Sequence, residues 1–320
     1  MKLSLVSVFL CSSALLQAQP TSHKCPPAIS TVANTAESVG AAPSGTQASS
    51  SASGGIGFTE SRQAISRGEE DVLALFAAYA GAAYTVSNQW NCPYACEYPG
   101  TQGTVIEHHW NIGKPKSAGY IARNPNGKYI IVAFQGTDSS EQWADNLNVV
   151  QVPWPDGIDN SKVHAGFLRG YVVAQDDILG QLKPLADKYP DYSIVIVGHS
   201  LGGARASLAL LDISLKMPEL LPRMYMYTVG QPRTGNREFA NAIDALSVPK
   251  YRQVFEYDYV TRLPLVEMGY YHHSTEAWDH DNQTTLCAQR TKGDGCSSPG
   301  DLLHPLSVPD HFGYPGLKYK

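Results

Sequence analysis

Apolar and polar positions along the chain form blocks whose period changes from strand-like to helix-like. The clearest block is YSIVIVGHSLGGARASLALL at 192–211. Its continuous apolar run at 194–197 predicts a strand buried on both faces, and the small residues that follow predict a helix packed closely on a sheet. Further blocks predict a hairpin at 117–137 that turns at Asn126 and Gly127, strands at 224–230 and 251–257, and helices at 72–84, 174–189 and 239–246.

The order of these elements indicates the fold class. Strands that alternate with helices are typical of an α/β protein, so we expect a central, mainly parallel sheet with helices on both faces. Acidic residues at 69–71 precede the first helix, where they favour a helix N-terminus. Residues 58–320 have the length of one such domain with a sizeable core.

The first 57 residues have a different composition. A lysine, a short apolar run and small residues around Ala18 predict a secretory signal peptide over 1–18, because the run is too short to span a bilayer. Residues 19–57 are rich in Ser, Ala, Thr and Gly and predict a disordered arm or propeptide. No later segment is apolar for long enough to span a membrane. We therefore expect a secreted, extracellular protein.

Charge and cysteine content narrow the function classes. The formal net charge of −5 and the pI near 6.0 provide no basic patch for nucleic acid or anionic membranes. Two of the six cysteines lie in the first 57 residues. The other four form two local pairs, and secretion favours disulfides over the alternative, a zinc site. The predicted disulfides are Cys92 with Cys96 and Cys287 with Cys296.

The segment Gly198, His199, Ser200, Leu201, Gly202 has the form G-x-S-x-G, the nucleophile elbow of α/β-hydrolases. A strand that turns sharply into a helix leaves no room for side chains two positions either side of the apex, which explains the two glycines. The turn lifts the Ser200 hydroxyl clear of the sheet and directs the Leu201 N–H toward a developing oxyanion. The alternative is an ordinary strand-to-helix turn with a capping serine.

A serine nucleophile needs a base and an acid, which follow it in the order Ser, Asp or Glu, His in this fold. Asp258 is the best-placed acid because it ends a predicted strand, although it could also only cap a turn. Position alone does not choose between His304 and His311 as the base. The remaining histidines after the serine include His272 and His273, whose tyrosine neighbours favour a core or surface role.

The chain resembles a known family, the secreted fungal class 3 lipases, which also contain feruloyl esterases. The resemblance rests on VAFQGT, VHAGF, YSIVIVGHSLGGARA, GQPRTGNREFA, FEYDYVTRLP and PDHFGYPG. It implies the α/β-hydrolase fold and an acyl-enzyme mechanism, with Ser200 as nucleophile, Asp258 as acid and His311 as base. It also implies that Thr137 and Leu201 form the oxyanion hole. The Cys287 and Cys296 pair matches a family disulfide, and no cofactor or metal is implied.

The segment after Thr137 bears on the substrate. Trp143, Leu147 and Val150 are spaced i, i+4, i+7 and predict an apolar stripe on a short helix. The stripe alone favours an ordinary surface helix, whereas its place after the oxyanion residue favours the family's lid. We therefore expect a monomeric triacylglycerol lipase acting at an oil–water interface. A feruloyl esterase or phospholipase is the alternative enzyme, and a catalytically silent binding protein is the alternative of another class.

Overall fold

The computed structural model describes residues 62–137, 149–287, 296–297 and 307–318. The predicted signal peptide and arm lie outside these residues. The strands are β1 Arg62–Ala64, β2 Val105–Ile112, β3 Ser117–Asn124, β4 Tyr129–Phe134, β5 Gln151–Pro153, β6 Lys162–His164, β7 Ser193–His199, β8 Met224–Val229, β9 Lys250–Phe255, β10 Glu276–His280 and β11 Gln283–Cys287. The helices are α1 Arg67–Ala82, α3 Ala165–Lys188, α4 Leu201–Lys216 and α5 Arg237–Ala245. Short 3-10 turns span Ala95–Glu97, Pro218–Arg223, Val260–Arg262, Val266–Met268 and Pro309–Phe312.

Nine of the described strands form one sheet in the order β1-β11-β10-β9-β8-β7-β4-β3-β2. The five central strands, from β10 to β4, run parallel, and the strands at both ends pair antiparallel. The prediction of a central parallel sheet is confirmed, with the antiparallel edges added. The edge strands β1, β2, β10 and β11 escaped prediction because they lack the long apolar runs of the buried strands.

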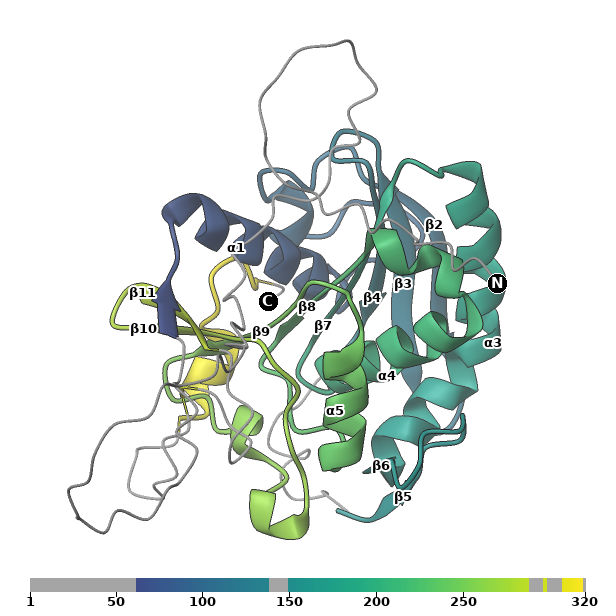
Figure 1. Cartoon of the computed structure of the whole chain (residues 1–320). Coiled ribbons are helices and arrows are strands. Elements are labelled where there is room, and N and C mark those ends of the chain that lie inside the picture. The colour runs from purple at the N-terminus through teal and green to yellow at the C-terminus, as the bar shows by residue number, and fades with distance from the viewer. Residues whose placement is uncertain (1–61, 138–148, 288–295, 298–306, 319–320) are drawn as a thin grey trace, which may run out of the picture.

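Helices cover both faces of the sheet, as predicted (Figure 1). In β7, Ile194 and Ile196 pack in one core cluster with side chains of α3, α4 and α5. The alternate residues Val195 and Val197 pack in a second cluster with side chains of α1. Since successive strand residues point to opposite faces, the unbroken apolar run supplies both cores at once.

Two helix starts show how local chemistry sets the boundaries. At α1, Ser66 and Glu69 form a capping box in which the Ser66 backbone N–H donates to the Glu69 carboxylate over 2.8 Å. The helix α3 begins at Ala165, well before the predicted start at 174. Its N-cap is His164, whose Nδ1 accepts hydrogen bonds from the Gly166 and Phe167 N–H groups. Histidine is outside the usual set of capping residues, so the sequence carries no ordinary start signal there.

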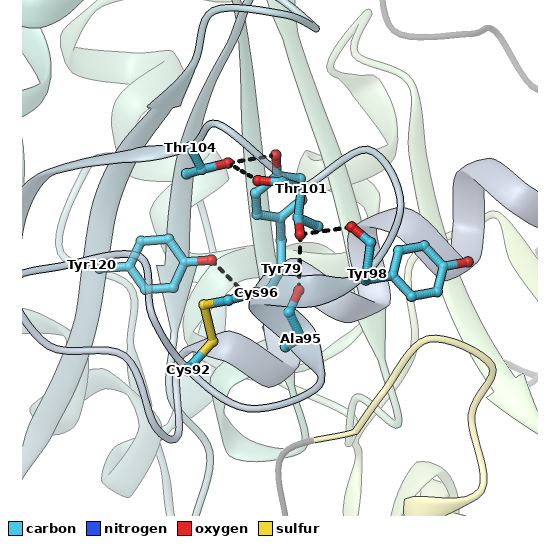
Figure 2. The surroundings of a disulfide bond; sticks show 8 residues. All are labelled: Tyr79, Cys92, Ala95, Cys96, Tyr98, Thr101, Thr104 and Tyr120. Carbon is cyan, nitrogen blue, oxygen red and sulfur yellow. Dashed lines mark hydrogen bonds between the residues drawn. A yellow bond between two sulfur atoms is a disulfide. The ribbon is translucent and has the colours of Figure 1, made fainter.

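Both predicted disulfides form, with Cα–Cα distances of 5.2 Å for Cys92–Cys96 and 5.9 Å for Cys287–Cys296. Figure 2 shows the first pair beside α1, in a segment whose Thr101 hydroxyl donates to the Ala95 carbonyl oxygen over 2.9 Å. In the described part of the chain, no cluster of three or more His, Cys, Asp or Glu has the arrangement of a metal site. No helix there is long and apolar enough to cross a membrane.

Candidate active site

The serine elbow lies between β7 and α4. Ser200 has φ 58° and ψ −129°, in the left-handed half of backbone space, and its N–H donates to the Val229 carbonyl oxygen over 2.8 Å. A Cβ on Gly198 would lie 2.3 Å from the backbone of Gly202, and one on Gly202 would lie 2.1 Å from the Phe134 carbonyl oxygen. Neither position has room for a side chain, so the strained turn depends on both glycines, as the motif predicts.

The candidate acid and base lie together at the carboxyl ends of the central strands. His311 Nδ1 lies 2.8 Å from Asp258 Oδ2, and both side chains are buried. The other carboxylate oxygen of Asp258 accepts the Val260 N–H over 2.9 Å. Because both oxygens of the Asp258 carboxylate are held in place, the carboxylate fixes the orientation of the His311 ring. The other ring nitrogen, Nε2, can then accept a proton.

Strand β8 brings the serine to this pair. Val229, which accepts the hydrogen bond from the Ser200 N–H, is followed by Gly230 with φ 56°. A Cβ on Gly230 would lie 2.9 Å from Asp258 Oδ2 and 2.9 Å from the His311 ring. The end of β8 therefore lies against both the elbow and the acid–base pair. The predicted residues Ser200, Asp258 and His311 all lie around it.

Tyr314 contacts the candidate acid, and the sequence did not predict this contact. Its hydroxyl donates to Asp258 Oδ2 over 2.6 Å, the same oxygen that faces His311. Burial and the Asp258 charge raise the pKa of Tyr314 well above its usual value, so the hydroxyl stays a donor. The residue stands in the quoted block PDHFGYPG, but its contact becomes visible only when that block folds against Asp258.

His199, which precedes Ser200 in the elbow, holds the loop that carries His311. Its Nε2 donates to the His311 carbonyl oxygen over 2.9 Å, because a carbonyl can only accept, and its Nδ1 then accepts the Tyr84 hydroxyl over 2.8 Å. Burial and the nearby His311 lower the pKa of His199 well below its usual value. The ring therefore remains neutral and packs against the His311 ring at a centroid distance of 4.5 Å.

The two predicted oxyanion residues line one cavity of about 230 Å³. Thr137 follows the end of β4, and Leu201 is the first residue of α4. A backbone N–H in the first turn of a helix has no intrahelical partner and lies at the positive end of the helix dipole. The fold thus places the two predicted oxyanion donors beside the same space at the active-site edge of the sheet.

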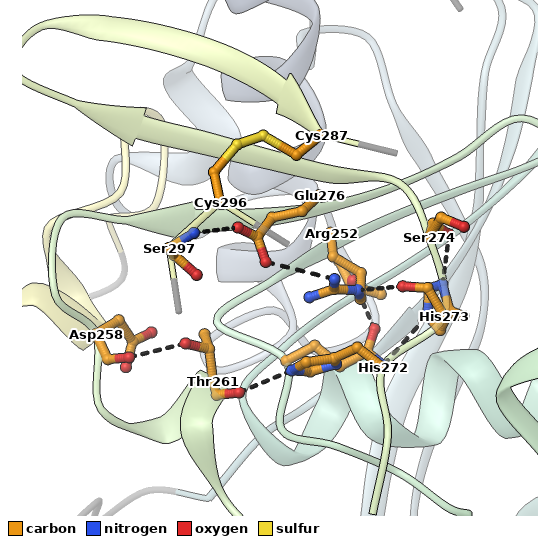
Figure 3. Close-up of polar contacts among 12 residues, drawn as sticks. Arg252, Asp258, Thr261, His272, His273, Ser274, Glu276, Cys287, Cys296 and Ser297 are labelled. Atoms are coloured by element: carbon orange, nitrogen blue, oxygen red, sulfur yellow. Dashed lines mark hydrogen bonds and ion pairs between the residues drawn. A yellow bond between two sulfur atoms is a disulfide. The ribbon is translucent and has the colours of Figure 1, made fainter. Parts of the chain in front are cut away.

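The other candidate histidines are engaged elsewhere. His272 Nε2 donates to the Thr261 carbonyl oxygen over 2.7 Å, and His273 Nδ1 donates to the Ser274 carbonyl oxygen over 2.8 Å (Figure 3). Burial lowers the pKa of both rings well below the usual value, so both are neutral members of the core, as predicted. His304 lies outside the described residues.

Only one end of the predicted lid stripe is described. Trp143 and Leu147 lie outside the described residues, so the predicted helix stays a prediction. Val150 lies just before β5 with 52% of its surface exposed.

The disulfide Cys287–Cys296 is joined to the Asp258 turn by polar contacts (Figure 3). The Ser297 N–H donates to Glu276 over 2.8 Å, and the Ser297 carbonyl oxygen accepts from Arg262 over 2.7 Å. Arg262 belongs to the 3-10 turn that follows Asp258. The disulfide therefore holds a segment that steadies the loop of the candidate acid.

The known proteins that this chain resembles are lipases. The family model described as lipase (class 3) matches residues 131–268. The chain is 32% identical to a lipase of Rhizomucor miehei over 71% of this chain and 62% of that protein. It is 31% identical to a secreted mono- and diacylglycerol lipase A of Penicillium cyclopium over 67% of this chain and 72% of that protein. A solved triacylglycerol lipase structure, described as having a serine protease triad as its catalytic centre, matches with TM-score 0.73 and 29% identity, over 81% of this chain and 98% of that one.

Proposed function

The chain belongs to the class 3 lipase family, and from this we propose that it is a triacylglycerol lipase that uses Ser200, His311 and Asp258 as a catalytic triad. The observation that carries the proposal is the buried His311–Asp258 pair at 2.8 Å, packed on the same β8 terminus as the strained serine. The serine protease triad of the matched triacylglycerol lipase structure supports the same chemistry. The match spans 62% of the Rhizomucor miehei lipase, so the activity of the whole protein is part of the proposal.

In the proposed reaction, Ser200 Oγ attacks the ester carbonyl carbon while His311 Nε2 takes the hydroxyl proton. Asp258 holds the Nδ1–H and stabilises the imidazolium that forms. The tetrahedral oxyanion accepts hydrogen bonds from the N–H groups of Leu201 and Thr137. The alcohol leaves with the proton from His311, and water then hydrolyses the acyl-enzyme by the same steps in reverse order. No cofactor or metal takes part.

We also propose secretion, with a signal peptide over 1–18, an arm or propeptide over 19–57 and a catalytic domain over 58–320. The two disulfides support an oxidising compartment, because such bonds persist mainly outside the cytosol. The word "secreted" in the name of the Penicillium cyclopium relative points the same way. N-terminal sequencing of protein from culture medium tests the boundaries, and a mature protein that begins at residue 1 would contradict them.

The proposed substrates are acylglycerols at an oil–water interface, attacked by a monomer. Rates of acid release from a triacylglycerol emulsion, a phospholipid and a feruloyl ester test this directly, with Ser200→Ala as the control. We expect the emulsion to be the best substrate and the control to be silent. A preference for the feruloyl ester would favour the esterase, and absence of hydrolysis of all three would favour a binding protein on the same fold.

The predicted lid gives this proposal a second test. Large apolar side chains gain roughly 1.5 to 3 kcal/mol each when they leave water, so the stripe of Trp143, Leu147 and Val150 favours an oil surface. We expect the rate on a short-chain triglyceride to rise steeply above its solubility limit. Trp143→Ser should blunt this rise and leave hydrolysis of a dissolved p-nitrophenyl ester intact. A rate that saturates below the solubility limit would count against a lid.

A further inference from the structure

The turn between β10 and β11 carries a sequence motif that ester hydrolysis does not use. Asn282, Gln283 and Thr284 have the form N-x-T, in which the middle residue is not proline. No other N-x-S or N-x-T occurs in the 320 residues. In a protein that passes through the secretory pathway, this motif is the acceptor for an N-linked glycan.

The turn presents the Asn282 side chain to solvent. Its closing pair is His280 with Gln283, and the two residues between them, Asp281 and Asn282, have φ 52° and 59°. Positive φ at both positions is typical of a type I′ hairpin turn, which favours Asp and Asn. Asn282 is exposed, and its amide makes no hydrogen bond with the described residues. Since the turn lies at one side of the molecule (Figure 1), there is room for a sugar chain on this amide.

Asn282 also lines a cavity of about 560 Å³ formed by α1 and by the strands β9, β10 and β11. Its described lining includes four carboxylates, two half-buried aromatic rings and one cation: Glu70, Asp71, Glu256, Asp279, Tyr98, Phe255 and Arg67. The carboxylates of Asp71 and Asp279 have no hydrogen-bond donor among the described residues. Burial and the Glu70 charge raise the pKa of Asp279, as expected for such a carboxyl group. Sugar hydroxyls are donors for carboxylate oxygens, and aromatic rings offer apolar surface to a sugar ring.

We propose that Asn282 carries an N-linked glycan whose first sugar lies over this cavity. The inference goes beyond the proposed ester hydrolysis and rests only on the proposed secretion. In the transfer, the Asn282 side-chain nitrogen forms a bond with the anomeric carbon of the first N-acetylglucosamine. The bond from that carbon to the diphosphate of a lipid-linked oligosaccharide breaks, the amide loses one proton, and the lipid diphosphate leaves.

The burial of Thr284 sets the time of this transfer. In the folded chain only 4% of Thr284 is exposed, its N–H donates to the Glu70 carboxylate over 3.3 Å, and its carbonyl oxygen accepts from the Ile65 N–H over 3.1 Å. The transferring enzyme needs access to this threonine, which is lost once β11 has paired with β1 and β10. The glycan is therefore added before β11 joins the sheet.

The first experiment is peptide mass spectrometry on protein secreted from a yeast host. We expect the wild-type peptide that contains Asn282 to carry N-acetylglucosamine and hexoses. Thr284→Val, which leaves the turn unchanged, and Asn282→Gln should both abolish this mass, whereas the matched control Thr284→Ser should keep it. Secreted wild-type protein with unmodified Asn282 would overturn this inference alone. Absence of the protein from the medium would contradict the proposed secretion and overturn the inference with it.

The second experiment tests the contact between the first sugar and the cavity. Endoglycosidase H leaves a single N-acetylglucosamine on Asn282, so trimmed wild-type protein should keep the Tm of the intact glycoprotein. Thr284→Val should unfold about 2–8 °C lower, the shift that about one or two lost hydrogen bonds cause in a domain of this size. Wild type and Thr284→Val from a bacterial periplasm, where neither carries a glycan, give the effect of the substitution itself, which is subtracted. Equal Tm values for the trimmed protein and Thr284→Val after this subtraction would overturn the contact.

Discussion

Gly198→Ala is the sharpest structural perturbation of the serine elbow. The added Cβ would lie 2.3 Å from the Gly202 backbone, whereas ordinary van der Waals contact begins at 3.4 Å. The two sides of the elbow must therefore separate by about 1 Å, and the backbone atoms that meet the Cβ cannot rotate away. Overpacking of this kind costs about 1–3 kcal/mol. For a domain of this size each kcal/mol shifts Tm by about 2–4 °C, so we expect Tm to fall by about 2–12 °C.

We expect Gly198→Ala to have a larger effect on kcat than on thermal stability. A displacement of about 1 Å between reacting groups costs on the order of 10²-fold in rate, and the elbow carries both Ser200 and the Leu201 N–H. Thermal unfolding and kcat on a dissolved p-nitrophenyl ester measure the two effects separately. Steady kcat with a lowered Tm would show that the elbow relaxes without moving the serine.

Gly180→Ala makes the same chemical change where there is space. Gly180 lies inside α3, and apart from its chain neighbours and the adjacent backbone of its own helix, no atom lies within 4 Å of a Cβ placed there. We expect a gain of about 0.5–1 kcal/mol from helix propensity and unchanged turnover. If Gly198→Ala matched Gly180→Ala in both Tm and kcat, the steric account of the elbow would be refuted.

Three further outcomes follow from the site and its surroundings. Asp258→Asn should lower kcat roughly 10⁴-fold because His311 loses the partner that sets its tautomer, and a steady-state assay showing near-normal kcat would contradict this. Thr137→Val should lower kcat about 10²- to 10³-fold with little change in KM if the hydroxyl joins the oxyanion hole, and unchanged kcat would leave only its N–H as donor. The folded pKa of His164 is about 4, below its usual 6.5, so the unfolded chain binds the proton first and stability falls as pH drops from about 6.5 to about 4. His164→Asn, which keeps a capping acceptor, should flatten that pH dependence in urea unfolding, and an unchanged slope would count against it.

Local patterns predicted the parts of the molecule whose causes are local. The apolar run at 194–197 must lie in a buried strand, and the glycines around Ser200 are required within a single turn. The disulfides could be paired because each joins cysteines that are close in sequence, at separations of 4 and 9 residues. These predictions are confirmed, whereas the catalytic roles of the site residues remain proposals.

The contacts that escaped prediction are long-range or chemically unusual. The Tyr84–His199 hydrogen bond joins residues 115 positions apart, and the Tyr314–Asp258 bond joins residues 56 positions apart. The sequence pattern around Tyr84 or Tyr314 does not indicate which distant residue its hydroxyl will contact. The early start of α3 was not predicted for another reason. Its N-cap is His164, whose ring accepts the hydrogen bonds that Ser, Thr, Asp or Asn usually accepts.

The central claim is that Ser200 is the nucleophile. Reaction of the folded protein with an organophosphonate ester, followed by peptide mass spectrometry, measures this most directly, because only an activated serine attacks the phosphorus. We predict one equivalent of adduct on the peptide that contains Ser200, formed in parallel with the loss of ester hydrolysis. An adduct on a different residue, or full inhibition with Ser200 unmodified, would contradict the account.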